Sequence, residues 1–345
     1  MPPSLVHGYA ARTKGGSLEP FAHEPPKLRE SEVRVSVSHC GICYTDIHGI
    51  DDFYGISTFP FVPGHEIVGH VSEVGSAVEG LEVGERVGIG WQGRSCMKCE
   101  DCLRGEPQLC YDVDRAPVWA PYGGFSSSVV ADFRFVYPLP DAMPAEAAAV
   151  LMCAGVAVYN PLRSIATAPS RKVAVLGVGG LGHLAIQFAH ALGCEVTAIS
   201  SSPSKQEETF AFGADRFIVA GDKAGMKAIN RGLDLIVYTS HAEADWTSLI
   251  LSLRSEGRIA MVGFPPGLLA FEPMELVVRQ LSITGSILGS PRVMREMLSF
   301  AQAHGIRPVV EIMPMSAVND ALRKLEENRA RYRIVLVRSE GKSET

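Results

Sequence analysis

Hydrophobic and polar positions follow two different patterns along the chain. In the first part, segments 33–39, 67–74 and 85–89 alternate apolar and polar residues, as half-buried strands do. Glycine and proline interrupt these segments at short intervals, which is typical of a compact β domain. We therefore predict that the chain begins with a barrel-like domain of short strands.

From Lys172 onward the strands become fully apolar, as strands buried on both faces of a parallel sheet are. Helical stretches separate them, which predicts a doubly wound α/β sheet of the Rossmann type. The six predicted strands are 172–177, 195–200, 216–220, 234–238, 258–263 and 281–286.

The last part carries no nucleotide signature. A helix at 291–303, an apolar segment at 309–315, an amphipathic helix at 317–328 and a strand at 333–337 are predicted there. We assign this part to the β domain. The predicted domains are thus 1–155 with 287–345, and an inserted nucleotide domain at 156–286.

One further helix is predicted at the end of the first part. Asp141 is a suitable cap and Pro144 suits a first turn. Cys153 falls near the end of this helical stretch, and Gly155 predicts a change of direction after it.

Composition restricts the class of protein. The chain has 345 residues, 46% of them hydrophobic, which indicates about two globular domains. A net charge of −6 gives no electrostatic case for a nucleic acid or an anionic membrane as partner. The N-terminus lacks a signal-peptide pattern, and no apolar run has the length of a membrane span. We expect a cytoplasmic protein.

Half of the eight cysteines crowd into one short segment. In a long chain without an export signal, this clustering indicates a metal rather than disulfides. Such tight spacing lets one loop wrap a tetrahedral ion with four thiolates and leave no open position, so we predict a structural zinc. The predicted ligands are Cys96, Cys99, Cys102 and Cys110.

A second set of metal-ligand residues is spread over the first part. Cys43 and His65 offer a thiolate and an imidazole, and Cys153 is the candidate third ligand of a zinc with one open position. Thr45 and His48 follow Cys43 closely, where a hydroxyl and an imidazole can pass a proton outward. Taken singly, a cysteine is more often a small buried hydrophobe than a ligand, and a histidine is more often satisfied within a core.

Glu66 directly follows the candidate ligand His65. Two interpretations of this carboxylate stay open. It binds or orients groups near the metal, or it is a buried carboxylate held by backbone groups or an arginine.

A glycine-rich turn marks the start of the second domain. Gly177, Gly179, Gly180, Leu181 and Gly182 lie between an apolar strand and an amphipathic helix. In that context the glycines permit a tight turn and let a pyrophosphate approach the N-terminus of the helix.

The end of the next strand bears on the choice of cofactor. An acidic residue at this place grips the ribose 2′-hydroxyl of NAD. Here Ser200, Ser201 and Ser202 stand instead, followed by Lys205, which favours a 2′-phosphate. The sequence predicts NADP(H) rather than NAD(H).

The remaining candidate contacts are distributed more widely. Further cofactor-binding candidates are Thr239, Val262, Gly263, Ser286, Ile287 and Arg333. An apolar substrate pocket is expected from Trp91, Trp119, Phe53 and Leu288, with Tyr54 as a further candidate, although each also suits a core position.

With these motifs, the chain resembles the zinc-dependent medium-chain alcohol dehydrogenases, and most of all their cinnamyl alcohol dehydrogenase-like branch. The stretches that carry the resemblance include CGICYTDIH, PGHEIVGHVSEVG, the four-cysteine segment, GVGGLGH and RYRIVLV. The resemblance implies a GroES-like catalytic domain, a catalytic zinc on Cys43, His65 and Cys153, and a Cys40 that is not a ligand.

The resemblance also implies roles beyond the metal. A proton relay from Thr45 to His48, a pyrophosphate contact from Arg333 (with Arg331 two residues away) and a homodimer or tetramer are expected. Tyr44 departs from the family, where relatives often carry histidine. The segment from Leu281 to Leu288 is a candidate for pairing across a two-fold axis.

The predicted activity is reversible NADPH-dependent reduction of aromatic or medium-chain aldehydes to primary alcohols, with two zinc ions per chain. Three alternatives stay open. They are an NAD-dependent alcohol dehydrogenase, a non-enzymatic NADPH-binding zinc protein, and a redox-responsive protein that signals by releasing zinc from the four cysteines.

Overall fold

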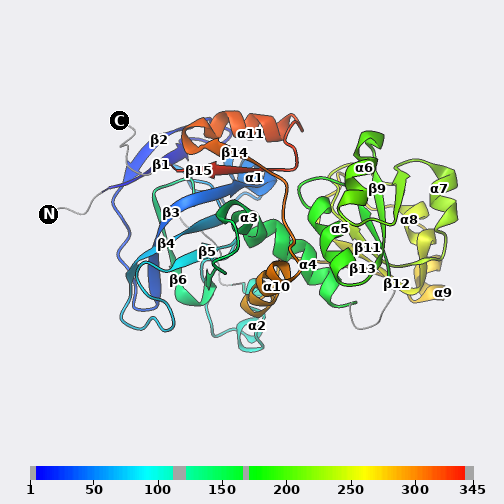
Figure 1. Ribbon diagram of the computed structural model, residues 1–345, viewed down its shortest axis with the longest axis horizontal. Coiled ribbons are helices and arrows are strands. Elements are labelled where there is room, and N and C mark those ends of the chain that lie inside the picture. Colours follow the sequence, from blue (N-terminus) through cyan, green and yellow to red (C-terminus); the bar gives the residue numbers. More distant parts are fainter. Residues whose placement is uncertain (1–4, 112–121, 166–170, 339–345) are drawn as a thin grey trace. The chain divides into compact units, whose positions relative to one another are not determined.

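The computed structural model describes residues 5–111, 122–165 and 171–338. Two compact units are present, shown in Figure 1. The first contains Met1–Cys153, Gly289–Gln302 and Pro308–Thr345, and the second contains Ala154–Leu288 and Ala303–Arg307. The chain therefore enters the second unit just after Cys153, two residues before the predicted boundary.

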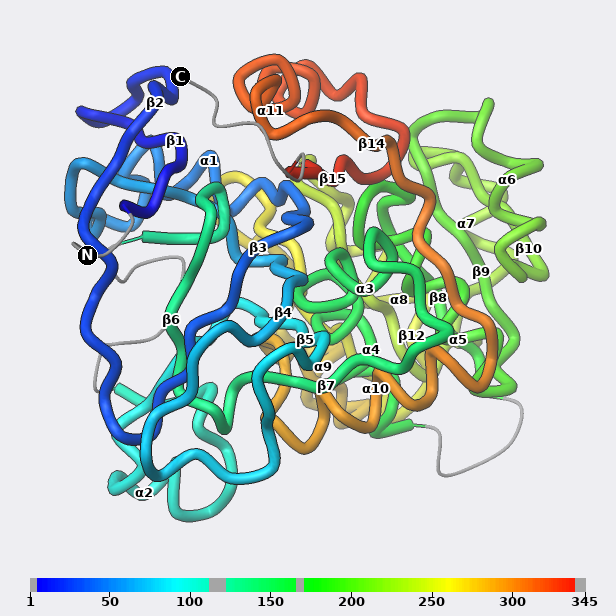
Figure 2. Tube along the Cα trace, turned by 60° about the vertical axis from the view of Figure 1, so that its left-hand side comes forward, coloured from blue at the N-terminus to red at the C-terminus, as the bar shows by residue number. Residues whose placement is uncertain are grey.

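The first unit is built on a seven-stranded sheet and a separate two-stranded one. The large sheet has the order β14-β15-β3-β4-β5-β7, and β6 also pairs with β3. The C-terminal strand β15 pairs antiparallel with β3, near the start of the chain (Figure 2). The strands are β1 (Val6–Ala11), β2 (Leu18–His23), β3 (Glu32–Ile42), β4 (Glu66–Val74), β5 (Arg86–Ile89), β6 (Ser128–Asp132), β7 (Val136–Pro138), β14 (Val310–Pro314) and β15 (Arg333–Val337).

Alternating side chains of these strands fill one core. Val33, Val35 and Val37 of β3 point inward together with Ile67 of β4 and Leu336 of β15. The helices of this unit are α1 (Tyr44–Ile50), α2 (Glu100–Leu103), α3 (Ala145–Val150), α10 (Pro291–Ala303) and α11 (Val318–Glu326), with short turns η1 (Pro107–Leu109), η2 (Phe133–Phe135) and η5 (Met315–Ala317).

The second unit is a six-stranded parallel sheet in the order β10-β9-β8-β11-β12-β13. Numbered within the unit, this order is 3-2-1-4-5-6, that of a dinucleotide-binding sheet. The predicted doubly wound sheet is thus confirmed. Its strands are β8 (Lys172–Leu176), β9 (Glu195–Ser200), β10 (Arg216–Val219), β11 (Leu233–Tyr238), β12 (Leu253–Met261) and β13 (Ser282–Gly285).

Helices pack on this sheet, with α5 against β8 and β9, and α8 against β12 (Figure 1). The apolar residues Leu184, Ile186 and Phe188 of α5 are fully buried. The helices are α4 (Val156–Arg163), α5 (Gly182–Ala191), α6 (Gln206–Ala211), α7 (Lys223–Ala228), α8 (Trp246–Ser252) and α9 (Met274–Arg279), with the turn η4 (Pro203–Lys205).

Two predictions about the helix before Cys153 were wrong. Asp141 does not cap it, because α3 begins at Ala145 with Pro144 in the capping position. The helix also does not end near Cys153, since it continues through a π-helical turn, η3 (Leu151–Gly155), into α4. Among the described residues, Ala145–Arg163 alone has the length and composition of a membrane span, and 83% of that window is buried, as in a core helix.

Candidate active site and metal centre

Three adjacent strands bring the site residues of the first unit together. In the antiparallel register of β3 and β4, Gly41 lies opposite Glu66, so Cys43 and His65 are neighbours just beyond the paired residues. On the other side of β3, Ile42 lies opposite Ile334, which places Arg333 at the same edge. The order of the strands therefore explains why His65 and Arg333, which follow Cys43 by 22 and 290 positions in the chain, lie close to it.

Cys153 completes this group from the helical side. It lies in the π-helical turn η3, and such turns insert an extra residue that redirects a side chain, often at functional sites. Ligand atoms of Cys43, His65, Glu66 and Cys153 all lie within 4.8 Å of one another. Cys153, His65 and Glu66 are buried, and Cys43 is partly exposed.

Asp46 holds this group in place, and sequence reasoning missed it. It lies at the third position of α1, where its Oδ2 accepts a hydrogen bond from the backbone N–H of Cys43 at 2.9 Å. Its Oδ1 accepts from the Gly64 N–H at 3.0 Å and lies 2.8 Å from Nδ1 of His65. An acidic residue three positions after Cys43 matches a helix-capping pattern, which was the available signal.

The contact with Asp46 determines which nitrogen of His65 faces the other ligands. Because an ionised carboxylate only accepts hydrogen bonds, Nδ1 carries the proton and Nε2 presents its lone pair. Among the described residues, Nε2 of His65 is buried and has no hydrogen-bond partner. A buried, unsatisfied imidazole nitrogen beside two sulfurs is the donor set that zinc requires.

The ionisation of these groups also favours a cation. The Cys153 thiol, and then His65, hold the pKa of Cys43 well below its ordinary value, although burial opposes them. The contact with Cys43 and burial raise the pKa of the Cys153 thiol. Burial alone lowers the pKa of His65, but Asp46 and Cys43 outweigh it and raise this pKa. The pocket thus stabilises one thiolate and can exchange the remaining protons for a metal ion.

The contacts of Glu66 agree in part with each of the two interpretations that the sequence left open. Its Oε1 accepts a hydrogen bond from Arg333, and its Oε2 is buried without a partner among the described residues. Burial raises the pKa of Glu66 to about 7, against the opposing effect of Arg333. Gly41 has no side chain, which leaves the space that this carboxylate occupies.

Thr45 and His48 lie on α1, beside the ligand group. The Oγ1 of Thr45 is 3.6 Å from Sγ of Cys43. His48 is partly exposed and stacks on Phe53, with 4.7 Å between ring centroids. The structure thus groups Thr45 with the ligands and places His48 one turn further along the same helix.

The four clustered cysteines also meet. Their sulfurs lie within 4.8 Å of one another, and the separations include 3.9 Å for Cys96–Cys102, 3.8 Å for Cys99–Cys110 and 3.5 Å for Cys96–Cys110. A Zn–S bond of about 2.3 Å places the corners of a tetrahedron about 3.8 Å apart. The segment fits a zinc ion, and all eight cysteines of the chain are free of disulfides.

The glycine turn of the second unit has the geometry of a pyrophosphate loop. Gly177 has a φ of 95°, which favours glycine, and a side chain at Gly182 would collide with the Gly177 carbonyl. Above Gly179 there is open space, as a site for close approach of a phosphate requires. Thr239 donates its hydroxyl to the carbonyls of Leu176 and Gly177.

The serine stretch lies next to this turn. Ser200 is buried at the end of β9, and its Oγ accepts from the Ser202 N–H at 3.2 Å. Lys205 donates to the carbonyl of Val178 at 2.6 Å, which brings its ammonium group to the glycine turn. Hydroxyls and a cation therefore gather where the ribose of a dinucleotide would lie.

The remaining predicted residues are placed as follows. Val262, Gly263, Ser286 and Ile287 follow the ends of β12 and β13 in the second unit. Arg333 is buried and paired with Glu66, while Arg331 is exposed, so the pyrophosphate contact stays a prediction. Trp91 and Leu288 are partly buried, Phe53 is exposed, and Trp119 lies outside the described residues.

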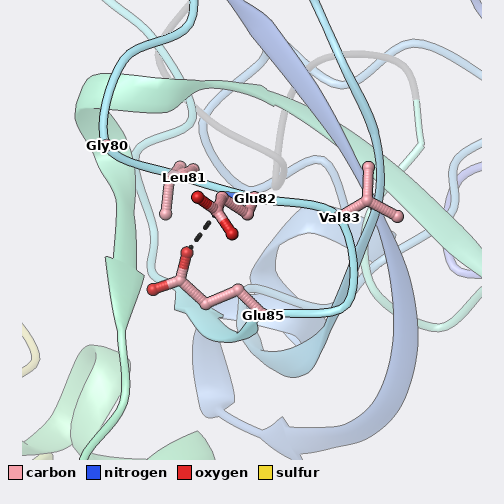
Figure 3. Close-up of a pocket in the computed structure, with 5 residues that line it drawn as sticks. All are labelled: Gly80, Leu81, Glu82, Val83 and Glu85. Carbon is pink, nitrogen blue, oxygen red and sulfur yellow. Dashed lines mark hydrogen bonds between the residues drawn. The ribbon is translucent and has the colours of Figure 1, made fainter.

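A separate open hollow of about 560 Å³ lies at the β4–β5 loop, lined by Gly80, Leu81, Glu82, Val83 and Glu85 (Figure 3). There the Glu82 N–H donates to Oε2 of Glu85 at 3.2 Å. None of the predicted site residues lines this hollow, so we assign it no role in the chemistry.

Comparison with known proteins now identifies the class. Residues 29–141 match the alcohol dehydrogenase GroES-like domain, and residues 180–303 match the zinc-binding dehydrogenase domain. The chain belongs to the zinc-binding alcohol dehydrogenase family. The predicted family and the GroES-like plus Rossmann architecture are thereby confirmed.

Individual relatives refine the comparison. The chain is 38% identical to the aldehyde reductase AdhA of Synechocystis over 98% of this chain and 100% of that protein. It is 38% identical to a probable cinnamyl alcohol dehydrogenase 6 of Oryza sativa, over 96% and 95%. The solved cinnamyl alcohol dehydrogenase SbCAD4 of Sorghum bicolor superposes with a TM-score of 0.91 at 36% identity, covering 99% of this chain and 100% of that one.

Proposed function

We propose that this protein is a zinc-dependent, NADPH-dependent reductase that converts aromatic or medium-chain aldehydes to primary alcohols and also catalyses the reverse reaction. The observation that carries the proposal is the convergence of Cys43, His65 and Cys153 within 4.8 Å, with the buried Nε2 of His65 facing the two thiols. The similarity to proteins named aldehyde reductase and cinnamyl alcohol dehydrogenase supports the substrate class.

In the proposed reaction, the residues of the chain hold the metal ion in place and transfer the proton. Cys43, His65 and Cys153 would hold the catalytic zinc, with Asp46 orienting His65. When bound, zinc supplies a Lewis acid that polarises the substrate oxygen, and the nicotinamide supplies the hydride. Thr45, 3.6 Å from Cys43, holds the proton destined for that oxygen, and His48 on the same helix exchanges it with solvent.

Glu66 and Arg333 form an ion pair next to the proposed metal ligands. Arg333 is a permanent cation, and its pairing with Glu66 places one positive and one negative group beside the thiolate ligand. We assign Glu66 a role next to the metal, because one of its carboxylate oxygens lies within 4.8 Å of the other ligand atoms and its Oε2 has no hydrogen-bond partner among the described residues. Cys96, Cys99, Cys102 and Cys110 would hold a second, structural zinc ion.

The preference for NADPH is supported by the end of β9. Residues 200–205 contain four serines, three of them consecutive, and a lysine but no carboxylate. Lys205 reaches the glycine turn through Val178, where its charge would neutralise a 2′-phosphate. A solved cinnamyl alcohol dehydrogenase of Helicobacter pylori, 28% identical with a TM-score of 0.86, over 96% of this chain and 98% of that one, is described in complex with NADP(H).

The test is the rate of NADPH and NADH oxidation with a panel of aromatic and aliphatic aldehydes, in the wild type and in Ser200→Asp. The carboxylate should repel the 2′-phosphate and lower the NADPH-to-NADH ratio of kcat/KM by about 10-fold or more. Ser299→Asp, which adds the same charge at an exposed position of α10, is the control and should leave the ratio unchanged.

Each outcome bears on a different part of the proposal. Turnover with NADH alone would make the protein an NAD-dependent alcohol dehydrogenase. An unchanged ratio in Ser200→Asp would contradict the assignment of Ser200. Failure of every aldehyde, in protein that binds NADPH and two zinc ions, would favour a non-enzymatic binding protein.

A homodimer is part of the proposal. On its outer side, β13 has no strand partner among the described residues, so it offers a free edge. Close to it in the sequence, Met274, Val277 and Val278 of α9 are exposed at 70% or more on one helix face. An apolar helix face and an open sheet edge in the same unit favour association with a second copy.

A further inference from the structure

Three aromatic rings and one hydroxyl group surround the imidazole of His48. Phe53 stacks on its face at 4.7 Å and an interplanar angle of 20°. Tyr44 and Tyr54 approach edge-on at 5.2 and 5.7 Å. The phenol oxygen of Tyr54 lies 3.3 Å from Nδ1 of His48. One ring nitrogen of the proposed relay residue is therefore engaged by a side chain that the relay does not include.

The turn after α1 fixes Tyr54 in this place. The Phe53 N–H donates to the carbonyl of His48 at 2.9 Å. Ser57 stabilises the other end of the turn, since its N–H donates to Oδ1 of Asp52 and its hydroxyl donates to the Gly49 carbonyl. Asp52 itself has a φ of 45°, an uncommon conformation that these contacts stabilise. The position of Tyr54 is thus set by the fold of the turn.

A phenol hydroxyl suits both protonation states of histidine. Its oxygen accepts from Nδ1–H of the imidazolium and equally from Nδ1–H of the neutral imidazole. In either state Nδ1 keeps its proton, so the proton that His48 exchanges enters and leaves at Nε2. Burial, and then the charge of Cys43, raise the pKa of Tyr54, so the hydroxyl stays protonated at neutral pH.

We propose that Tyr54 is a positioning residue for His48, which holds the neutral imidazole in its Nδ1–H tautomer and fixes the plane of the ring while Nε2 exchanges the proton. This inference rests on the proposed relay through Thr45 and His48. Tyr54 itself donates no proton to the substrate, and the single proton of each turnover passes through Nε2 of His48.

The direct test is the tautomer of His48, read from ¹⁵N chemical shifts of protein labelled at its ten histidines. His48→Gln assigns the signal. We expect the Nδ1–H pattern in the wild type and a mixture of tautomers in Tyr54→Phe, which removes only the hydroxyl. An identical His48 spectrum in Tyr54→Phe would overturn the proposal. Tyr9→Phe, a hydroxyl deletion on β1, is the control.

A double-mutant cycle supplies the kinetic test. Tyr54→Phe should lower kcat for aldehyde reduction by about 5-fold, the contribution of one hydrogen bond. In a His48→Gln background the same change should have no further effect on kcat. An equal loss in both backgrounds, or a change in KM alone, would show that Tyr54 contacts substrate instead.

The two proposals fail differently. If the wild type reduces no aldehyde with either nucleotide, the proposed function is wrong, and the tautomer measurement alone decides the role of Tyr54. If the wild type turns over and the His48 spectrum is unchanged in Tyr54→Phe, only the inference about Tyr54 is wrong.

Discussion

At the scale of single residues, Asp46 connects three parts of the site. Its two oxygens accept from the backbone of Cys43, the backbone of Gly64 and the ring of His65. It is fully buried, so each of these hydrogen bonds replaces water that cannot reach the group. The candidate metal ligands were recognisable by residue type, whereas the sequence marked this carboxylate only as a helix cap and its contacts revealed the support it gives.

Asp46→Asn should therefore weaken the catalytic metal site. An amide keeps one acceptor oxygen but turns an N–H₂ group toward the N–H of Cys43, so one buried donor loses its partner. We expect zinc affinity at this site to fall about 10- to 100-fold. Competition with a chromophoric chelator measures it, and Asp51→Asn, at an exposed position, is the control. Unchanged affinity would mean that His65 is oriented without Asp46.

At the scale of elements, we expect the four-cysteine segment to depend on a bound metal more than on packing. Cys102 and Cys110 are buried, but Leu103 is 75% exposed and Tyr111 is 82% exposed. With so few apolar side chains inside, we expect binding energy from a metal to supply much of its folding energy. The segment is thus expected to behave as a unit separate from the sheet.

Cys99→Ser should remove one of two zinc ions per chain and open this segment. Zinc content by elemental analysis should fall by one equivalent, and limited proteolysis should cut between residues 94 and 111 faster than in the wild type. Cys40→Ala is the matched control, because Cys40 is buried in the core of the β domain and should retain both ions. Loss of both ions in Cys99→Ser would contradict two independent sites.

A second element-scale feature joins β14, α11 and the turn before β15. Glu311 on β14 pairs with Lys324 on α11 and accepts from the Arg331 N–H at 2.6 Å. Burial raises the pKa of Glu311, but Lys324 and Arg331 outweigh it, so the pKa is lowered from its ordinary 4.5.

The sign of the resulting pH dependence follows from that shift. A carboxylate with a lowered pKa stabilises the folded state above about pH 4.5, and this contribution is lost as the pH falls through the folded-state pKa. At pH 7, Glu311→Gln should lower the thermal midpoint by about 1 to 3 °C. The difference from the wild type should shrink below pH 4. Calorimetry at both pH values measures it, with the exposed Glu326→Gln as control.

At the scale of the whole molecule, the exposed face of α9 predicts the state of assembly. If it joins two copies, the double variant Val277→Glu, Val278→Glu should place four charges in the interface and dissociate it. Light scattering after size exclusion should then give the chain mass of 37.1 kDa instead of twice that value. Val83→Glu, which adds a charge at an exposed position of the first unit, should remain dimeric. An unchanged mass in the α9 variant would place the interface elsewhere.

Local patterns were sufficient for much of the fold and the candidate site. The six parallel strands, the glycine turn and the four cysteines were predictable because apolar runs, turn residues and ligand spacing are properties of neighbouring residues. The helix around Cys153 was predicted less well. Gly155 suggested an end, yet packing carries the chain through a π-helical turn into α4.

The sequence by itself determined which residues can bind zinc and which turn can cradle a pyrophosphate, since those abilities belong to side-chain chemistry and backbone freedom. Only the tertiary structure decided that Arg333 meets Glu66, that Asp46 holds His65, and that Tyr54 engages His48. Strand order and the turn after α1 create these contacts. A pattern of neighbouring residues does not predict them, because they depend on how the chain is folded in space.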